Sequence, residues 1–230
     1  MRKESVSTVV FRFDGTLLDI DLLETSRNMA MHMDISVANA ETFVCSLAGV
    51  IAEFPIIVGP KKVTSIMLAE TLDSLMHNVL NSSDITSQQV IEALQTSDHY
   101  VCSVSPKVLD TIMYLYQKGY KLVSTGNTFT TVQMELLRRY GMLKYFDGVF
   151  GPLGNYYSSY PTSFKSILKG SEPEHFMFVS HCLGTDINTA HSMGMKTTLL
   201  SKGAKGSGSV VFTCTPDHII ENFNDLDVIL

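Results

Sequence analysis

Strand and helix signals alternate along the C-terminal half of the chain, and this alternation constrains the fold more than any other feature. Apolar and β-branched runs predict strands at Tyr120–Val123, Phe146–Phe150, His175–Val179 and Lys196–Leu200, with one more strand left open at Val210–Thr213. Apolar residues at three- and four-residue spacing predict helices at Pro106–Gly119, Thr130–Tyr140, Ser163–Leu168 and Asp186–Ser192. Strands that alternate with helices form βαβ units. We therefore expect an α/β protein with a Rossmann-like, doubly wound parallel sheet.

A further strand is predicted near the N-terminus, at Val6–Phe13. Its apolar run is continuous rather than alternating, which is typical of a parallel strand buried on both faces. The run ends at an acidic, glycine-containing turn, Asp14-Gly15. A bulky cation, Arg12, stands where the strand meets this turn, and its role is the main question that the sequence raises.

The region between this first strand and the alternating half has a helical pattern throughout. Helical spacing is clearest at Ala38–Ala52, Val63–Val79 and Ser87–Leu94. Proline, glycine and serine residues separate these segments, and no confident strand signal lies between them. We expect two domains: a Rossmann-like core made of residues 1–19 and 103–230, and an all-helical cap made of residues 20–102.

Composition narrows the classes of partner. The net charge of −6 disfavours a nucleic-acid backbone as the main partner. No apolar stretch approaches the roughly 20 residues that a transmembrane helix needs, and no signal-peptide pattern follows the charged start of the chain. The four cysteines are scattered, which is typical of reduced thiols. We expect a cytoplasmic protein that binds neither nucleic acid nor membrane.

Four segments carry family-like motifs: FRFDGTLLD at 11–19, KLVSTGNT at 121–128, the segment before TSFKSIL at 162–168, and FMFVSHCLGTDINTAHSMGMKTTLL at 176–200. In these segments, and in their order and spacing, the chain resembles the haloacid dehalogenase (HAD) superfamily. The resemblance is to its helical-cap, phosphoglycolate phosphatase-like branch. It implies a HAD core with a helical cap inserted after the first strand.

The resemblance also implies a chemistry and the residues that perform it. In the family, the first aspartate of the first motif attacks a phosphorus or carbon centre, and the second, matched here by Asp14, is the general acid/base. A serine or threonine, matched here within Ser124-Thr125, holds the phosphate together with a lysine. Acidic residues of the fourth motif, of which Asp186 is one, help to hold magnesium. Asp14 and Asp186 are the only surviving candidates for metal ligands.

Three functional positions of the family are occupied by unsuitable residues. Arg12 stands at the nucleophile position, and a guanidinium stays protonated and offers no nucleophilic lone pair. The lysine position falls at either Ser158 or Tyr160, and neither is cationic. His181 replaces the first acid of the fourth motif. By this resemblance the active site is degenerate at Arg12, Tyr160 and His181, which leaves Asp14 without a reaction to assist.

Two compatible interpretations of Arg12 stay open. It is either an anion receptor at the former phosphate site, together with Ser124 and Thr125, or a structural cation between Asp14 and Asp186. A buried charge must find a partner, because arginine cannot lose its proton. We therefore expect Arg12 to pair with Asp14 or Asp186 and to leave no room for a hydrated divalent ion.

Three hypotheses for function follow. The leading one is a HAD-like protein without phosphatase activity that acts as a binding or regulatory pseudoenzyme for a small anionic ligand, with no cofactor. The first alternative is an active hydrolase for a small phosphorylated metabolite that uses a changed mechanism through Asp14, with magnesium as cofactor. The second alternative is a structural or interaction protein. The sequence does not identify the ligand or the oligomeric state.

Overall fold

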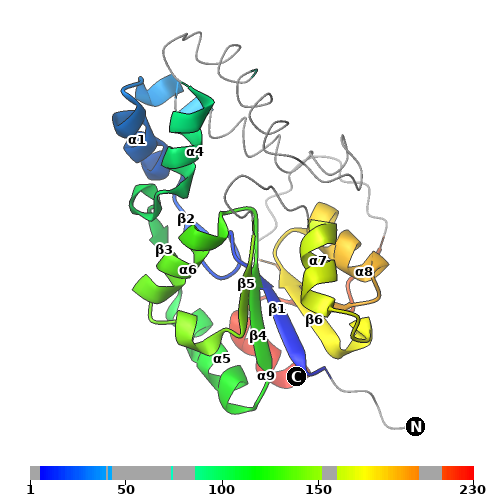
Figure 1. Ribbon diagram of the computed structural model, residues 1–230. Helices are drawn as coiled ribbons and strands as arrows, with labels where there is room; N and C mark the ends of the chain where they lie inside the picture. Colours follow the sequence, from blue (N-terminus) through cyan, green and yellow to red (C-terminus); the bar gives the residue numbers. More distant parts are fainter. Residues whose placement is uncertain (1–5, 40, 43–73, 75–85, 152–159, 202–213) are drawn as a thin grey trace, which may run out of the picture.

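A computed structural model describes residues 6–39, 41–42, 74, 86–151, 160–201 and 214–230 of the chain. Its centre is a six-stranded parallel sheet in the order β5-β4-β1-β6-β7-β8 (Figure 1). The strands are β1 (Thr8–Arg12), β4 (Lys121–Thr125), β5 (Gly148–Phe150), β6 (Phe176–Ser180), β7 (Lys196–Leu200) and β8 (His218–Ile220). The predicted α/β class and its doubly wound parallel sheet are confirmed.

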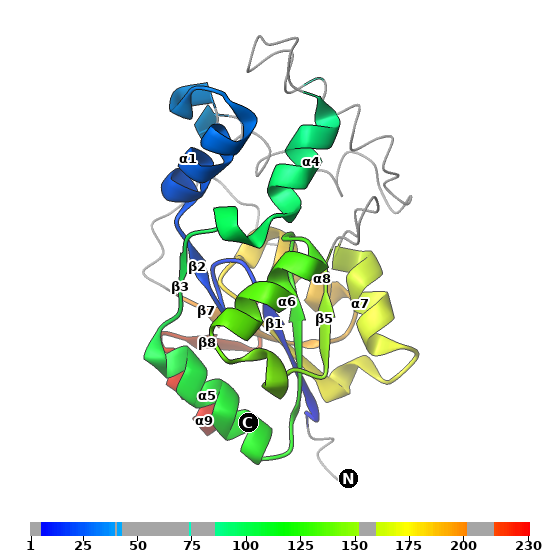
Figure 2. The ribbon, with the colours of Figure 1, turned by 60° about the vertical axis from the view of Figure 1, so that its left-hand side comes forward.

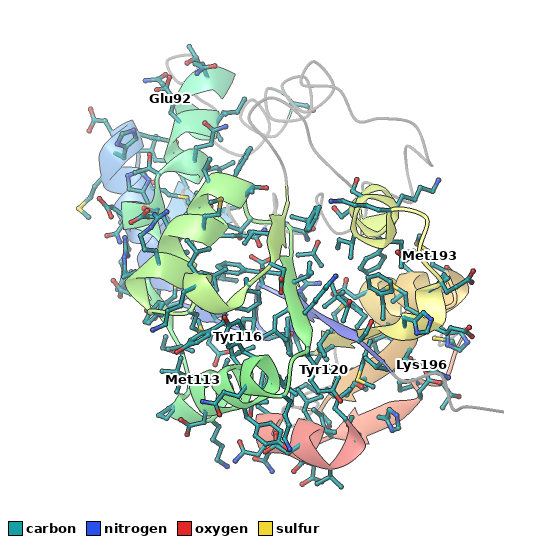
Figure 3. The ribbon with its side chains drawn as sticks, turned by 60° about the horizontal axis from the view of Figure 1, so that its bottom comes forward. Glu92, Met113, Tyr116, Tyr120, Met193 and Lys196 are labelled. Atoms are coloured by element: carbon teal, nitrogen blue, oxygen red, sulfur yellow. The ribbon has the colours of Figure 1, made fainter. Side chains whose placement is uncertain are left out.

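Helices cover both faces of the sheet. They are α5 (Pro106–Gln117), α6 (Thr130–Arg139) and α9 (Leu226–Ile229) on one face, and α7 (Tyr160–Leu168) and α8 (Asn188–Ser192) on the other. Met113 and Tyr116 of α5 lie at one side of the molecule and Met193, after α8, lies at the opposite side (Figure 3).

The side chains of β1 alternate between two apolar clusters, as a strand buried on both faces requires. Val9 and Phe11 pack among residues of α5 and α6, whereas Val10 packs with Phe164 of α7 and Phe178 of β6. All three β1 side chains are fully buried. This alternation also decides where Arg12 lies, because Arg12 follows Val10 by two residues and therefore leaves the same face.

Local signals in the sequence set the helix boundaries of the core. Pro106 occupies the first turn of α5, where its missing N–H costs nothing, and α5 is followed by Gly119 at a φ of +88°. Lys118, beside that glycine, lies at the end of the helix where its dipole favours a cation. The predicted helix at Pro106–Gly119 is thus confirmed within two residues of its end.

One strand of the six-stranded sheet was not predicted. β8 is three residues long and pairs with Thr198–Leu200 of β7 at the edge of the sheet. Its sequence, His218-Ile219-Ile220, follows a proline and an aspartate and is too short to show a period. The strand that was left open at Val210–Thr213 lies outside the described residues.

Two short strands, β2 (Asp19–Ile20) and β3 (Cys102–Ser103), pair antiparallel between the sheet and the helices α1 (Leu22–Met33) and α4 (Ser87–Gln95). α1 and α4 pack together at one end of the molecule, next to this pair (Figure 2). The other predicted helices of this region, Ala38–Ala52 and Val63–Val79, fall almost entirely outside the described residues, so the division into core and cap stays a prediction.

Asp21 and Thr86 cap the N-termini of these two helices. The Asp21 carboxylate accepts from the N–H of Glu24 at 3.0 Å, and the side chains of Thr86 and Gln89 form a reciprocal capping box.

Within the described residues, no helix is long and apolar enough to cross a membrane.

Candidate functional site

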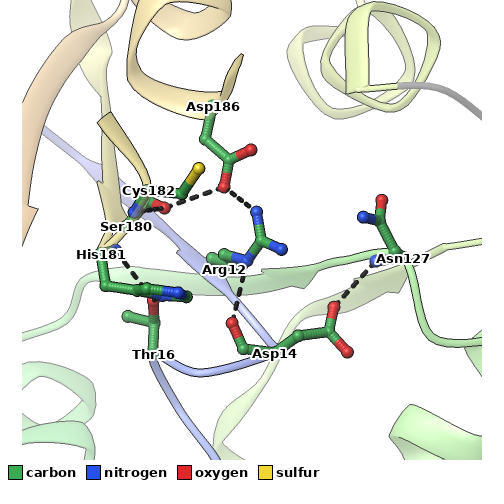
Figure 4. A network of polar contacts seen from close by, with 8 residues as sticks. All are labelled: Arg12, Asp14, Thr16, Asn127, Ser180, His181, Cys182 and Asp186. Carbon is green, nitrogen blue, oxygen red and sulfur yellow. Dashed lines mark hydrogen bonds and ion pairs between the residues drawn. The ribbon is translucent and has the colours of Figure 1, made fainter. Parts of the chain in front are cut away.

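The order of the strands reverses beside β1, so a binding crevice is expected at the carboxyl end of this strand. From β1 the chain proceeds to β4 and β5 on one side, and β6, β7 and β8 follow on the other side. Loops that leave neighbouring strands in opposite directions open a crevice, which is where ligands bind in open α/β sheets. The polar residues that meet here are Arg12, Asp14, Thr16, Asn127, Ser180, His181, Cys182 and Asp186 (Figure 4).

Arg12 forms an ion pair with Asp186 at the centre of this crevice. The Arg12 side chain is only 14% exposed, and that of Asp186 is completely buried. The Arg12 Nε–H also donates to the backbone carbonyl of Asp14 at 2.9 Å. The prediction that Arg12 would pair with Asp14 or Asp186 is confirmed: the carboxylate that it contacts is that of Asp186, and Asp14 contributes its main chain.

Asp186 has a second partner that the sequence analysis did not identify. The buried Ser180 hydroxyl donates to Asp186 Oδ2 at 2.9 Å and accepts from the N–H of Cys182 at 3.0 Å. Asp186 itself lies in a single π-helical turn, Leu183–Ile187, that precedes α8. Such turns are rare and concentrate at functional sites. The available signal for Ser180 was a hydroxyl on the residue directly after the predicted strand His175–Val179.

The Asp14 carboxylate faces the loop after β4 rather than Arg12 (Figure 4). Its Oδ2 accepts from the N–H of Asn127 at 2.9 Å, and its Oδ1 accepts from the Thr128 hydroxyl. A Cβ at Gly126 would lie 2.5 Å from Asp14 Oδ2, so only glycine allows this approach. Asp14 therefore acts as an acceptor that holds the β4–α6 loop.

The negative charge of Asp14 also influences the segment that returns from the helical region. Burial raises the pKa of Tyr100, and the charge of Asp14 raises it further. Burial likewise raises the pKa of Cys102 to about 11, with Arg139 opposing and Asp14 adding to the effect. Both groups are thus held in their neutral forms at neutral pH.

His181 and Thr16 bond to each other twice across the crevice. The N–H of His181 donates to Thr16 Oγ1 at 3.1 Å, and the same oxygen lies 3.0 Å from His181 Nδ1. The tautomer of the ring decides which of these two atoms donates in the second contact. The ring packs on Gly15, where a Cβ would lie 2.5 Å from its Cε1.

The two residues predicted to bind an anion beside Arg12 lie in different environments. The Ser124 hydroxyl is completely buried and donates to Gln133 Oε1 at 2.9 Å, so the structure does not bring it to Arg12. Thr125 is the register partner of Arg12, so both side chains leave the same face of the sheet. Its buried hydroxyl has no hydrogen-bond partner within the described part of the chain.

Only one of the two candidates for the lysine position, Tyr160, lies among the described residues. Tyr160 is the first residue of α7, and Ser158 lies outside the described residues. The choice between them therefore stays open.

Magnesium, the metal that the family resemblance implies, does not fit the residues present. The two oxygens that converge at the end of β1, the Asp14 carbonyl and an Asp186 carboxylate oxygen, already bind the guanidinium of Arg12. Both carboxylate oxygens of Asp14 are engaged by the β4–α6 loop. Among the described residues, no group of three or more His, Cys, Asp or Glu side chains is placed to hold a metal ion.

Comparison with known proteins agrees with the resemblance seen in the sequence. A family model described as HAD-hydrolase-like matches residues 158–226. No curated protein matches the chain.

Solved structures match over nearly the whole chain. A magnesium-bound structure of YfnB from Bacillus subtilis, described as a HAD-hydrolase, has a TM-score of 0.69 at 17% identity and covers 98% of this chain and 99% of its own. A predicted phosphoglycolate phosphatase from Haemophilus somnus 129PT gives 0.67 at 18%, with 100% and 99% covered. L-2-haloacid dehalogenase from Xanthobacter autotrophicus, with chloropropionic acid covalently bound, gives 0.68 at 16%, with 97% and 98% covered.

The chain therefore has the fold of the HAD superfamily, and the predicted resemblance to that superfamily is confirmed. At these identities the solved structures establish the fold and leave the activity to be argued from the site.

Proposed function

We propose that this HAD-fold protein lacks magnesium-dependent phosphatase activity and acts as a pseudoenzyme that binds or senses a small anionic ligand. The ion pair between Arg12 and Asp186 carries the proposal. Covalent catalysis in the family needs a carboxylate at the end of β1, where it attacks the substrate. At that position this chain has a cation, Arg12, which is paired with Asp186 in the loop after β6.

The changed-mechanism alternative would use Asp14 as the reactive carboxylate. Two hydrogen bonds to the Asp14 carboxylate, from Asn127 and Thr128, work against it. Donors to a carboxylate stabilise its charge and lower its basicity and nucleophilicity. The carboxylate is also directed toward the loop after β4 (Figure 4). We therefore prefer the binding role to a hydrolase that works through Asp14.

A small anion is the ligand class that the crevice favours. The Arg12 guanidinium supplies positive charge that is slightly exposed, and Thr125 supplies a buried hydroxyl on the same face of the sheet. Cationic and hydroxyl donors together are suited to phosphate or carboxylate groups. The dehalogenase structure from Xanthobacter autotrophicus, which has the same fold, has a small organic acid, chloropropionic acid, covalently bound.

We further propose that residues 20–102, the predicted cap, select the ligand, and that the protein works in the cytoplasm. The ends of that region pair as β2 and β3 beside the loop that carries Asp14. The helix α1, which follows β2, and the helix α4, which precedes β3, lie next to the pair (Figure 2). Segments so placed are able to control access to the crevice.

Turnover of 4-nitrophenyl phosphate with magnesium tests the proposal directly. We expect the wild-type protein to give only the background rate, unchanged in Arg12→Ala and in Asp14→Asn. Arg12→Asp should also be inactive, because the nucleophile alone does not restore the missing lysine or the acid replaced by His181; parts that act as a unit fail together. Wild-type turnover that magnesium stimulates and Asp14→Asn abolishes would establish the hydrolase alternative instead.

A further inference from the structure

One side chain joins two loops that come from different strands. The Arg12 Nε–H bonds to the carbonyl of Asp14, which follows β1, and its Nη1 bonds to the carboxylate of Asp186, which follows β6. β1 and β6 are neighbours at the centre of the sheet, at the point where the strand order reverses. The guanidinium thus lies where two oxygen atoms of separate loops converge.

These oxygens require a cation. The Asp186 carboxylate is completely buried, and a buried carboxylate without a compensating positive charge is strongly destabilising. The hydroxyl of Ser180 provides one hydrogen bond to it but no charge. Carbonyl and carboxylate oxygens are also the ligands that hard divalent cations prefer. The positions of the oxygens are therefore compatible with either a metal ion or an organic cation, and the chain supplies the organic one.

We infer that Arg12 is a resident cation that takes the structural role of a divalent metal ion at the carboxyl end of β1. The folded protein therefore does not depend on metal. The converse also follows. Replacing Arg12 by a carboxylate would join a third oxygen ligand to the Asp14 carbonyl and the Asp186 carboxylate, and would create a site for magnesium. This inference goes beyond the proposed function, because it concerns what stabilises the fold rather than what the protein turns over.

Thermal unfolding with and without magnesium tests the inference, using wild type, Arg12→Asp and the double variant Arg12→Asp/Asp186→Asn. We expect the melting temperature of the wild type to be the same in magnesium chloride and in EDTA, at constant ionic strength. That of Arg12→Asp should fall in EDTA and rise with the logarithm of magnesium concentration, as mass action requires for a ligand of the native state. The double variant should show a much smaller rise, because it lacks the carboxylate from β6.

Two results would overturn the inference: a wild type that magnesium stabilises as much as it does Arg12→Asp, or an Arg12→Asp response equal to that of the double variant. If Arg12→Asp is unfolded at every magnesium concentration, Arg12→Asn carries the test with the same two outcomes, since it removes the cation without adding a charge. A failure here is distinguishable from failure of the proposed function, which shows as wild-type turnover in the phosphatase assay.

Discussion

The carboxylate of Asp14 accepts a hydrogen bond from the hydroxyl of Thr128, and through this bond the loop after β1 holds the loop after β4. The N–H of Asn127 donates to the same carboxylate. The matching residue in the HAD family transfers protons. Here both oxygens of the Asp14 carboxylate instead accept hydrogen bonds from the β4–α6 loop. The finding suggests that this position is retained because it orders the crevice, and the idea is open to a simple test.

Asp14→Ala should lower the free energy of unfolding by about 1–3 kcal/mol, because it leaves the Thr128 hydroxyl and the Asn127 N–H without their acceptor in a largely buried loop. Denaturant unfolding measures the difference. Asp110→Ala, which changes an exposed carboxylate on α5, is the matched control and should shift stability by no more than about 0.5 kcal/mol. Equal effects of the two substitutions would show that Asp14 does not hold the loop.

The pair formed by Thr16 and His181 gives a second prediction. Thr16 is completely buried, and its hydroxyl is bonded to both the backbone N–H and the ring of His181. Thr16→Val keeps the shape and removes the hydroxyl, so we expect a loss of about 1–3 kcal/mol in unfolding free energy. Thr16→Ser, which keeps the hydroxyl, should retain more stability than Thr16→Val. If the serine variant is the less stable of the two, the methyl group rather than the hydroxyl is what matters at this position.

Asp217 gives a pH-dependent prediction away from the crevice. Burial acts to raise its pKa, but hydrogen bonds from the hydroxyl and N–H of Thr197, aided by Lys196 and His191, outweigh burial, so its pKa lies below the ordinary value of 3.8. A carboxylate with a lowered pKa in the folded state adds stability that is complete above the unfolded pKa. That stability is lost as the pH falls through the lowered pKa.

Asp217→Asn should therefore be less stable than wild type at neutral pH, and the difference should shrink as the pH falls below about 4. Urea unfolding at a series of pH values measures the two stabilities. A difference that is constant across this range, or that grows in acid, would contradict the assigned direction of the pKa shift.

The sequence was sufficient to predict five of the six strands of the sheet and the helices between them, because several independent signals mark each of these elements. The helices α5 and α6 each combine a regular apolar spacing with a glycine after their last turn, and both appear close to the predicted bounds. β8 lacks this redundancy. It has three residues, and pairing with β7 rather than any local pattern makes it a strand.

The sequence predicted a contact in the candidate site only for a charged side chain, because a buried charge must have a partner of opposite charge. Arg12 cannot lose its proton, so its pairing with an acid at the same sheet edge followed from the sequence. The direction of a neutral hydroxyl is not forced in this way. Ser124 and Thr125 are adjacent and chemically alike, yet Ser124 bonds to Gln133 on one face while Thr125 lies beside Arg12 on the other. Only the alternation of β4, together with its exact register on β1, separates their roles.

The free energy of unfolding of Arg12→Ala, compared with that of Arg27→Ala, tests most directly whether Arg12 is a buried structural cation. Arg27 pairs with Glu24 on the surface of α1, where both side chains are 45% exposed, and its loss should cost no more than about 1 kcal/mol. Removing Arg12 leaves the buried Asp186 without its cation and should cost about 3–5 kcal/mol. An Arg12→Ala protein that is as stable as Arg27→Ala would contradict the structural role assigned to Arg12.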